Sequence, residues 1–461
     1  MTTDLSNPRR RVLLALGAAL AAGARPVRAQ DEGAEPPRLA LLIGNRNYPD
    51  GEDLPPIHKN VRDLKAALEK RGFACTEALD LDQAASRALV ERFSAQVRQS
   101  PADATVLFYF SGHGAQVDAE NLLVGAGQSP KARPETLVKG SLQLTGDVVS
   151  TLPRRPQGLT IAIIDACRTS LKSALDGDGL NQVEAPPGTL IAFATGAGKP
   201  AIAPAVENVS TFYTASLVKL LNSASDEITF SDLFRLVKTD VQNTMLNHPV
   251  PLLRQFAQFP FIAENVQVRR RLAPRVAAAA TPPPPRFKDS DERADWDKLE
   301  AALWPGDVLR LAEDYLKRHP DSRLAGSAQV ARDGASEASQ ILRRNDVRLY
   351  RRSFQVGGSS GGGYGYGTPQ PQPDEEAVRS EIWKAGRGDK DAAARLGRRW
   401  RDTDRYEGWM QFAAALGNGI AAYDLALYYR RNGQPQPAAQ FEARARELGY
   451  TPPPSLDNTR K

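Results

Sequence analysis

The sequence contains very little cysteine, histidine or methionine. Of its 461 residues, two are cysteine, four are histidine and three are methionine. Two cysteines cannot form a disulfide framework, and neither Cys75 nor Cys167 has a partner at the spacing of zinc ligands. We interpret Cys75, at the start of a predicted strand, as a small buried hydrophobic residue. The sequence leaves open a bond between the two thiols, but that bond would silence Cys167 as a nucleophile.

A strong charge of one sign is also lacking. The formal net charge is +6, from 60 basic and 54 acidic residues. Residues 1–29 contain five arginines and a single acidic residue, Asp4, so removing this surplus of four leaves about +2. No run of lysines and arginines interleaved with aromatic residues occurs, and we therefore expect no nucleic-acid partner.

Long apolar runs are scarce. Val12–Ala24 is the most extended, and it is too short to cross a bilayer. It follows Arg9–Arg11 and precedes a small-residue cleavage site at Val27–Ala29, which is typical of a signal peptide over residues 1–29. The adjacent arginines favour the twin-arginine route, with general secretion and an uncleaved amphipathic anchor as alternatives. We expect no membrane span in the mature chain, and a periplasmic or secreted location.

Two apolar runs are each followed by reactive side chains. Leu159–Ile164 has the pattern of a buried strand in a parallel sheet, and Cys167 follows it closely. Ala104–Phe110 has the same pattern, and Ser111–Gly114, which contains His113, follows it. The carboxyl ends of neighbouring parallel strands meet at one edge of an open sheet. The sequence therefore predicts a thiol with an imidazole base beside it.

The rest of residues 37–265 alternates between strand and helix patterns. This alternation predicts an α/β fold, with a sheet of mainly parallel strands and helices on both faces. The other predicted strands are Arg38–Gly44, Phe73–Leu79, Thr189–Ala194 and an edge strand near Pro260–Ala263; the main predicted helices run from Val61 to Leu68, Gln83 to Gln99 and Ser231 to Asn243.

Several of these residues match the motifs of a known family. Ser111–Gly114 and Asp165–Arg168 resemble the dyad motifs of the caspase-like cysteine peptidases, with the histidine 54 residues before the cysteine. An aspartate two places before the cysteine makes the chain more similar to metacaspases and bacterial orthocaspases than to animal caspases. The resemblance covers residues 37–265. The other matching motifs are Leu42–Asn45 with Tyr48, Asn60 with Asp63, and Ser210–Thr214.

The resemblance implies a mechanism. Cys167 would attack the scissile carbonyl, and His113 would protonate the leaving amine. The backbone N–H groups of Gly114 and Cys167 would hold the oxyanion. The family needs no third triad member, and the sequence offers no convincing candidate for one.

The resemblance and the acidic residues together predict the substrate. Residues two apart on a strand face the same way, so Asp165 is expected beside the pocket next to Cys167. Asp63 matches a second acid that lines the primary pocket of metacaspases, although a helix-capping role is the alternative. Two carboxylates favour a guanidinium or ammonium group, which predicts cleavage after Arg or Lys.

We expect no cofactor. Many metacaspases bind calcium through a cluster of acids near the region that corresponds to residues 138–149, where this chain offers only Asp147. Calcium dependence is therefore not predicted. The loop over residues 170–187 contains one basic residue, Lys172. Self-cleavage after Lys172 and an enzyme that stays a single chain are both open.

The composition changes after residue 265. Residues 266–292 contain alanine and proline runs typical of a stiff linker, and residues 293–350 predict two or three helices. A Gly/Pro-rich linker over 355–375 leads to residues 376–450, where helix pairs resemble SEL1-type repeats, which are related to tetratricopeptide arrays. These repeats imply a protein-binding module, with a plain helical cap as the alternative, because such arrays usually need three units. Residues 451–461 form a tail.

Three functions fit the sequence. The first is an exported cysteine endopeptidase that cleaves after Arg or Lys and carries a partner-binding helical tail. The second is a catalytically silent caspase-like scaffold, against which the presence of both His113 and Cys167 argues. The third is another thiol hydrolase or transferase on the same sheet, which would have to match the dyad motifs by chance.

Overall fold

The structure is a computed structural model of the chain. It describes residues 36–170, 181–196, 201–202, 204–273, 285–355, 373–401 and 403–452, and gives the backbone alone for residues 167–170 and 373–374. The predicted signal peptide and Lys172 lie outside the described residues. We use "sheet region" for residues 36–273 and "helical region" for residues 285–452.

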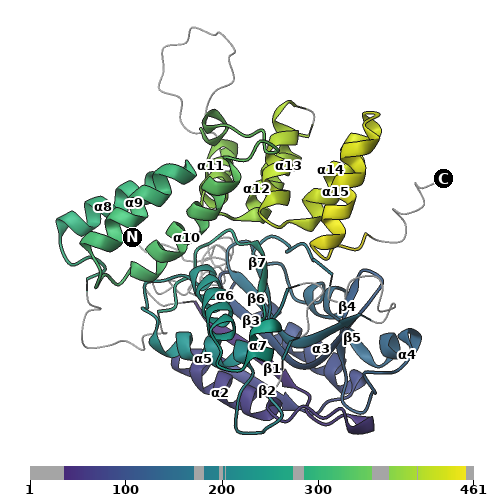
Figure 1. The fold of residues 1–461 in the computed structure, drawn as a ribbon. Helices are drawn as coiled ribbons and strands as arrows, with labels where there is room; N and C mark the ends of the chain where they lie inside the picture. Colours follow the sequence, from purple (N-terminus) through teal and green to yellow (C-terminus); the bar gives the residue numbers. More distant parts are fainter. Residues whose placement is uncertain are drawn as a thin grey trace, which may run out of the picture. The chain divides into compact units, whose positions relative to one another are not determined.

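The sheet region is built on one mainly parallel sheet (Figure 1). The strand order is β2-β1-β3-β6-β7-β8, in which only the β7–β8 pair is antiparallel, while β4 and β5 extend antiparallel from β3. This arrangement confirms the predicted fold class. The strands are β1 (Arg38–Gly44), β2 (Phe73–Leu79), β3 (Thr105–Val117), β4 (Glu120–Val124), β5 (Ser141–Gln143), β6 (Leu159–Ser170), β7 (Thr189–Phe193) and β8 (Phe261–Asn265).

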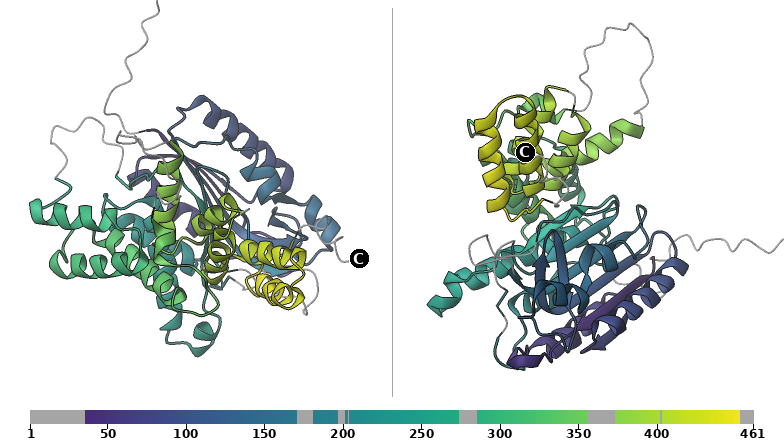
Figure 2. Two further views of the ribbon diagram at one scale, coloured as in Figure 1. Left: turned by 90° about the horizontal axis from the view of Figure 1, so that it is seen from above. Right: turned by 90° about the vertical axis from the view of Figure 1, so that its right-hand side faces the viewer.

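Helices cover both faces of the sheet (Figure 2). The side chains of α2, α5 and α6 pack on one face, and those of α3 and η2 pack on the other. Alternate residues of each strand contribute side chains to the two cores, because successive side chains of a strand point to opposite faces. The elements are η1 (Pro49–Gly51), α2 (Ile57–Lys70), α3 (Gln83–Gln99), α4 (Pro134–Lys139), η2 (Leu144–Val149), α5 (Phe212–Ser223), α6 (Phe230–Leu246) and α7 (Pro251–Gln255).

The two motif-bearing strands are longer than predicted. The predicted ends at Phe110 and Ile164 are wrong, because β3 and β6 continue as paired strands through both motifs. Pairing is the reason: the far half of β3 lies between β4 and β6, so its backbone stays extended even where the side chains are no longer a continuous apolar run. The motifs are therefore held within a sheet and not on loops.

The helical region consists of successive packed helices. Two apolar clusters lie within it, one centred on Trp296 and Tyr315 and the other on Trp409 and Phe412. Residues 376–450 form helix pairs, as predicted, while their assignment to SEL1-type repeats stays a prediction. The helices are α8 (Ser290–Ala301), α9 (Pro305–Arg318), α10 (Ala325–Ile341), η3 (Arg351–Phe354), α11 (Pro373–Ala385), α12 (Lys390–Arg399), α13 (Arg405–Ala415), α14 (Gly419–Arg431) and α15 (Pro435–Glu447).

The first residues of the predicted linker pack onto the sheet region. Leu272 is fully buried, and its carbonyl accepts a hydrogen bond of 3.2 Å from the guanidinium of Arg38. Residues 266–273 therefore belong to the sheet region, although residues 266–292 are predicted to form a linker. The described residues of the sheet region and the helical region fall within one compact unit.

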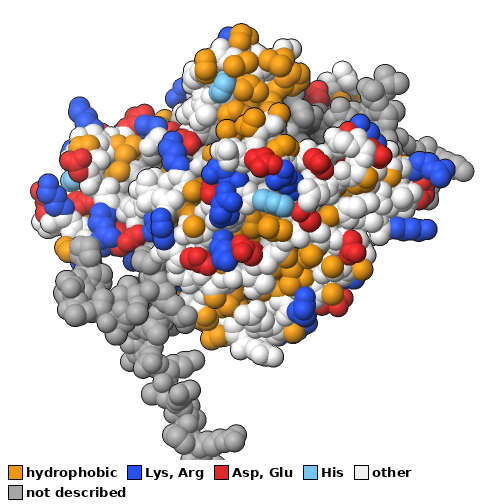
Figure 3. All heavy atoms as spheres, turned by 90° about the horizontal axis from the view of Figure 1, so that it is seen from below, with side chains coloured by type: hydrophobic (Ala, Val, Ile, Leu, Met, Phe, Trp, Pro, Cys, Tyr) orange, Lys and Arg blue, Asp and Glu red, His pale blue; other side chains and the backbone are white. Residues whose placement is uncertain are grey.

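The surface carries charges of both signs. Basic and acidic side chains are interspersed over the face drawn in Figure 3, with apolar side chains among them. This mixture matches the near balance of 60 basic and 54 acidic residues in the sequence. In the part of the chain that the structure describes, no helix has the length and apolar character needed to span a membrane.

Candidate active site

The sheet register brings the two predicted dyad residues together. On the adjacent parallel strands β3 and β6, His113 is the direct partner of Cys167. Neighbouring strands lie about 4.8 Å apart, so the backbones of the two residues are that close. The structure therefore joins a histidine and a cysteine that lie 54 residues apart in the sequence.

Two contacts fix the histidine. Its ring Nε2 lies 2.8 Å from the carbonyl oxygen of Glu52, and its backbone N–H donates to the hydroxyl of Tyr48 at 3.1 Å. A carbonyl oxygen only accepts, so Nε2 of His113 carries the proton and Nδ1 carries the lone pair. Among the described residues, Nδ1 has no hydrogen-bond partner. The free nitrogen of the ring is thus the one that can take up a proton.

Tyr48 contacts both the backbone and the ring of His113. It is buried, its ring meets that of His113 edge to face with centroids 4.6 Å apart, and its hydroxyl donates to the carbonyl of Val124 at 3.2 Å. A Cβ atom placed on Gly112 would lie 2.6 Å from the Tyr48 hydroxyl oxygen. The glycine before the histidine is therefore required for this close approach.

The role of Glu52 was not predictable from the sequence. The contact uses a main-chain carbonyl, which every residue has, so no residue type marks it. The side chain of Glu52 instead forms an ion pair with Lys131. Tyr48 did carry a signal, since it belongs to a motif that resembles the family, but the motif did not reveal what it contacts.

Burial changes the titration of the histidine. It lowers the pKa of His113 from its ordinary value of 6.5, and the hydrogen bond to the Glu52 carbonyl opposes this shift only in part. The ring is therefore neutral at pH 7. A neutral imidazole with a free Nδ1 is the form that accepts a proton from a thiol.

Asp165 lies in a buried polar cluster. Its side chain is 3% exposed, and its Oδ2 accepts hydrogen bonds from Thr211 and Thr214 at 2.6 Å each, and from Tyr109 and Asn60 at 3.4 Å each. Burial raises the pKa of Asp165, and the hydrogen bonds from Thr211, Thr214 and Tyr109 oppose the shift. All four bonds reach the same oxygen. Among the described residues, Oδ1 accepts none.

Asp63 lies at the rim of the same cluster. Its side chain is 29% exposed, and it forms an ion pair with Lys59 one turn earlier on α2. The hydroxyl of Ser210 donates to Asp63 at 3.4 Å, and the next residue, Thr211, donates to Asp165. The structure thus places both predicted substrate-binding acids along the segment 210–211. Asp63 caps no helix, since it lies inside α2.

Asn60 connects the parts of this cluster. It is fully buried, its amide donates to the hydroxyls of Thr211 at 3.1 Å and Ser111 at 3.3 Å, and its carbonyl oxygen accepts the Thr211 backbone N–H at 3.1 Å. Thr211 is also the N-cap of α5, through the N–H of Thr214. The sequence contained Asn60 and Thr211 within motifs, but their contacts with Asp165 depend on long-range packing.

Two further predicted features have defined places. Gly114 follows His113 inside β3, where its register partners are Leu123 and Arg168; its oxyanion role stays a prediction. Asp147 forms a two-pronged ion pair with Arg87, at 2.5 and 2.9 Å. Within the described ranges, no group of three or more histidine, cysteine, aspartate or glutamate residues is gathered in a way that could hold a metal ion.

Comparisons with known proteins place the sheet region in a known family. The family model described as the caspase domain matches residues 37–269. Among solved structures, the chain is similar to caspase-1 from Spodoptera frugiperda, with 16% sequence identity over 52% of this chain and 94% of that chain and a TM-score of 0.40. No curated protein matches the chain at a significant level.

Proposed function

The chain belongs to the caspase-domain family of cysteine peptidases, and from this premise we propose that it is an exported endopeptidase that uses Cys167 and His113 as its catalytic dyad. One observation carries the proposal: His113 and Cys167 are register partners on the adjacent parallel strands β3 and β6. A base and a nucleophile must come within hydrogen-bond reach, and this register supports that.

The proposed reaction begins with a proton transfer. Nδ1 of His113 takes the proton from the Cys167 thiol, because Nε2 is already protonated and donates to the Glu52 carbonyl. The thiolate then attacks the scissile carbonyl, and the backbone N–H groups of Gly114 and Cys167 hold the oxyanion. The protonated His113 gives its proton to the leaving amine. Water then cleaves the thioester, which releases the acid and restores the thiol.

The proposed substrate has arginine or lysine before the scissile bond. Support comes from Asp165, whose four hydrogen bonds all reach Oδ2 and leave Oδ1 for a cationic group. Asp63 adds a second carboxylate at the rim, where its ion pair with Lys59 would be exchanged for one with the substrate. A guanidinium is the group that two carboxylates bind best.

A panel of fluorogenic peptides tests the proposal. The peptides differ only in the residue before the scissile bond, which is Arg, Lys or Asp. We expect hydrolysis after Arg and Lys only, and a loss of about 10³-fold or more in Cys167→Ala. Hydrolysis by Cys167→Ala at the wild-type rate would support the silent-scaffold alternative and overturn the proposal.

Asp63→Ala sharpens the specificity test. We expect a lower kcat/KM for Arg peptides, because one of the two carboxylates is lost. Glu69→Ala is the matched control, because it removes an exposed carboxylate from the same helix, α2, without changing an ion pair of Asp63. An unchanged kcat/KM in Asp63→Ala would remove this residue from the pocket.

Two finer features complete the proposal. The signal-peptide pattern of residues 1–29 supports export to the periplasm or beyond.

Residues 376–450 are proposed to bind a protein partner. In support, a groove of about 550 Å³ lies between the segment 344–348 and the helices α13, α14 and α15, with side chains such as Gln411, Tyr429 and Phe441 along it.

A further inference from the structure

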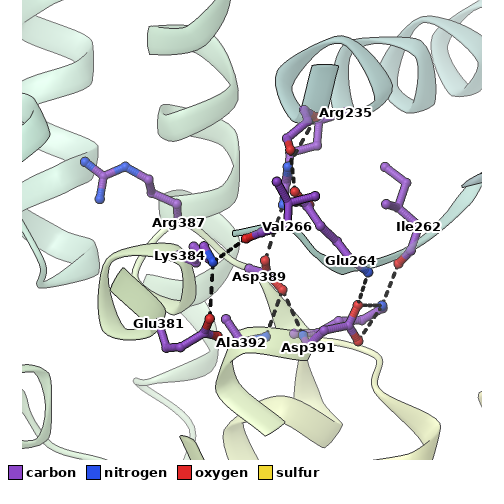
Figure 4. A network of polar contacts seen from close by, with 12 residues as sticks. Arg235, Ile262, Glu264, Val266, Glu381, Lys384, Arg387, Asp389, Asp391 and Ala392 are labelled. Atoms are coloured by element: carbon purple, nitrogen blue, oxygen red, sulfur yellow. Dashed lines mark hydrogen bonds and ion pairs between the residues drawn. The ribbon is translucent and has the colours of Figure 1, made fainter. Parts of the chain in front are cut away.

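The helical region is anchored on the open edge of the sheet. Strand β8 has β7 on one side only, so its other side presents unpaired backbone groups. Side chains from α11 and α12 bond backbone groups of β8 and of Val266, which follows it (Figure 4). The four bonds are Glu264 N–H to Asp391 at 2.8 Å, Lys390 to the Ile262 carbonyl at 2.7 Å, Arg395 to the Glu264 carbonyl at 2.8 Å, and Lys384 to the Val266 carbonyl at 2.7 Å.

Buried charges hold the same contact. Arg235 of α6 lies 2.7 Å from the carboxylate of Glu264 and 3.6 Å from that of Asp389, and both acids are almost fully buried. Breaking such a pair leaves a charge without a partner away from water. The anchor therefore fixes the helical region against the sheet edge, and does not leave it as a loosely tethered tail.

A second contact between the two regions is made by Gln182, whose side chain bonds two places in the helical region. The side chain amide of Gln182 donates to the carbonyls of Gly417 at 3.1 Å and Leu448 at 2.7 Å, and its oxygen accepts the N–H of Gly419 at 2.8 Å. Gln182 is 6% exposed. Gly417 lies in the α13–α14 turn, Gly419 is the first residue of α14, and Leu448 follows α15 directly. The carboxamide thus binds two turns at once.

The neighbouring Asn181 joins this contact to the sheet. Its side chain exchanges two hydrogen bonds with the backbone of Thr451, at 2.8 and 3.0 Å, and also donates to the carbonyl of Ala119 at 3.2 Å. Its backbone N–H donates to the side chain of Asn121 on β4 at 2.9 Å. Residues 181–182 are therefore held between the helical region and β4.

The sheet register connects this contact with the dyad. Asn121 is the partner of Gln116 on β3, and Gln116 is the partner of Ser170 on β6. Both strands reach this point three residues after the His113–Cys167 pair. At about 3.3 Å per residue, the contact lies about 10 Å from the dyad along the strands. Movement of residues 181–182 would therefore be passed to the ends of β3 and β6.

We propose that Asn181 and Gln182 are positioning residues through which the helical region holds the dyad strands in register. The proposal rests on the proposed function, since it assigns to the helical region a role in that same site. The partner of the α13–α14 turn and of the end of α15 is then a segment of the chain's own sheet region. The open groove beside α13, α14 and α15 stays available to another protein.

The test is Gln182→Glu in the full chain. The substitution keeps the size of the side chain and turns a donor into a carboxylate that faces two carbonyls. We expect kcat for an Arg peptide to fall on the order of 10-fold to 100-fold with little change in KM, because the dyad and not the substrate pocket is displaced. Gln157→Glu, the same change on an exposed residue before β6, should leave both constants unchanged.

Two readouts do not depend on peptide hydrolysis. Iodoacetamide alkylation of Cys167, followed by mass spectrometry, should slow in Gln182→Glu as the base moves away from the thiol. Cys75 should stay largely unmodified in both proteins, because burial raises its pKa to about 12, so the alkylation reports on Cys167. Hydrogen exchange over residues 115–124 should accelerate in Gln182→Glu alone.

The outcomes separate the two proposals. A wild-type chain that cleaves no peptide overturns the proposed function, and the alkylation and exchange rates then decide the positioning role. Unchanged kcat in Gln182→Glu with an active wild type overturns the positioning role and leaves the peptidase standing. If Gln182→Glu does not fold, Gln182→Met, which removes the three bonds without adding charge, replaces it, and a thermal melt confirms that it is folded.

Discussion

The sheet region and the helical region are held together by different kinds of contact. In the sheet, neighbours such as β3 and β6 are far apart in the sequence, and Thr105 pairs with Leu159. In the helical region, helices mainly pack on the next helix along the chain, as in repeat proteins. A change in the helices away from the Gln182 contact should therefore stay local, whereas a change in the sheet should reach the proposed dyad through the strand register.

Close backbone approach occurs in both regions and makes the comparison testable. Gly112 lies against the Tyr48 hydroxyl beside the dyad. Gly334 of α10 lies against the carbonyl of Arg387, where a Cβ atom would come within 1.9 Å. The same substitution should thus damage chemistry in one region and stability in the other.

The largest effect is expected from Gly112→Ala. The added methyl group would displace Tyr48 and with it the backbone of His113, and a displacement of about 1 Å in an active site costs on the order of 10²-fold in rate. We expect kcat/KM for an Arg peptide to fall by about that factor. Gly146→Ala is the control, because its nearest contact is the end of the flexible Gln143 side chain. Equal activities in the two variants would contradict the role of Tyr48.

Gly334→Ala should act on stability. Overpacking against a backbone carbonyl costs about 1–3 kcal/mol, and the helices around α10 should unfold first. Thermal unfolding followed by circular dichroism measures the change, and a loss in helical signal before the main transition is expected. A melting curve identical to that of the wild type would show that α10 can move without cost.

Thr211→Val should affect both stability and activity. It removes the N-cap of α5 and one of the short bonds to Asp165, for a loss of about 1–2 kcal/mol in the free energy of unfolding. Asp289→Ala removes the N-cap of α8 in the helical region, and should cost a similar amount without changing kcat/KM. Full activity in Thr211→Val would show that the bond from Thr211 to Oδ2 of Asp165 is not needed to position this carboxylate for the substrate.

The smallest expected effect is on the pH dependence of the free energy of unfolding. The folded-state pKa of His113 lies below its ordinary value of 6.5, so the unfolded chain binds more protons in this window. The contribution of His113 to stability is therefore complete above about pH 6.5 and is lost as the pH falls toward the folded-state pKa. His113→Gln keeps a donor for the Glu52 carbonyl and does not titrate, so urea unfolding should show a shallower loss on acidification. If the stability of His113→Gln falls with acidification as steeply as that of the wild type, another titrating group and not His113 controls this loss.

Residue patterns alone predicted the fold class, the family resemblance and the two residues that we propose as the dyad. Buried strands can be predicted from a local run of apolar residues, and both motifs lie directly after such a run. The helices of residues 376–450 could also be predicted from the sequence, because their apolar residues repeat at helical spacing. The ends of β3 and β6 could not be predicted in this way, because the pairing between these strands continues beyond their apolar side chains.

Tertiary structure alone decided which atoms support the site. The Glu52 carbonyl that fixes the His113 tautomer is a main-chain group and leaves no mark in the sequence. The four bonds to Asp165 and the contact of Gln182 with two distant turns join residues far apart along the chain. Periodicity reports whether a side chain is buried, but its partner depends on how the elements pack, and only the folded chain contains that information.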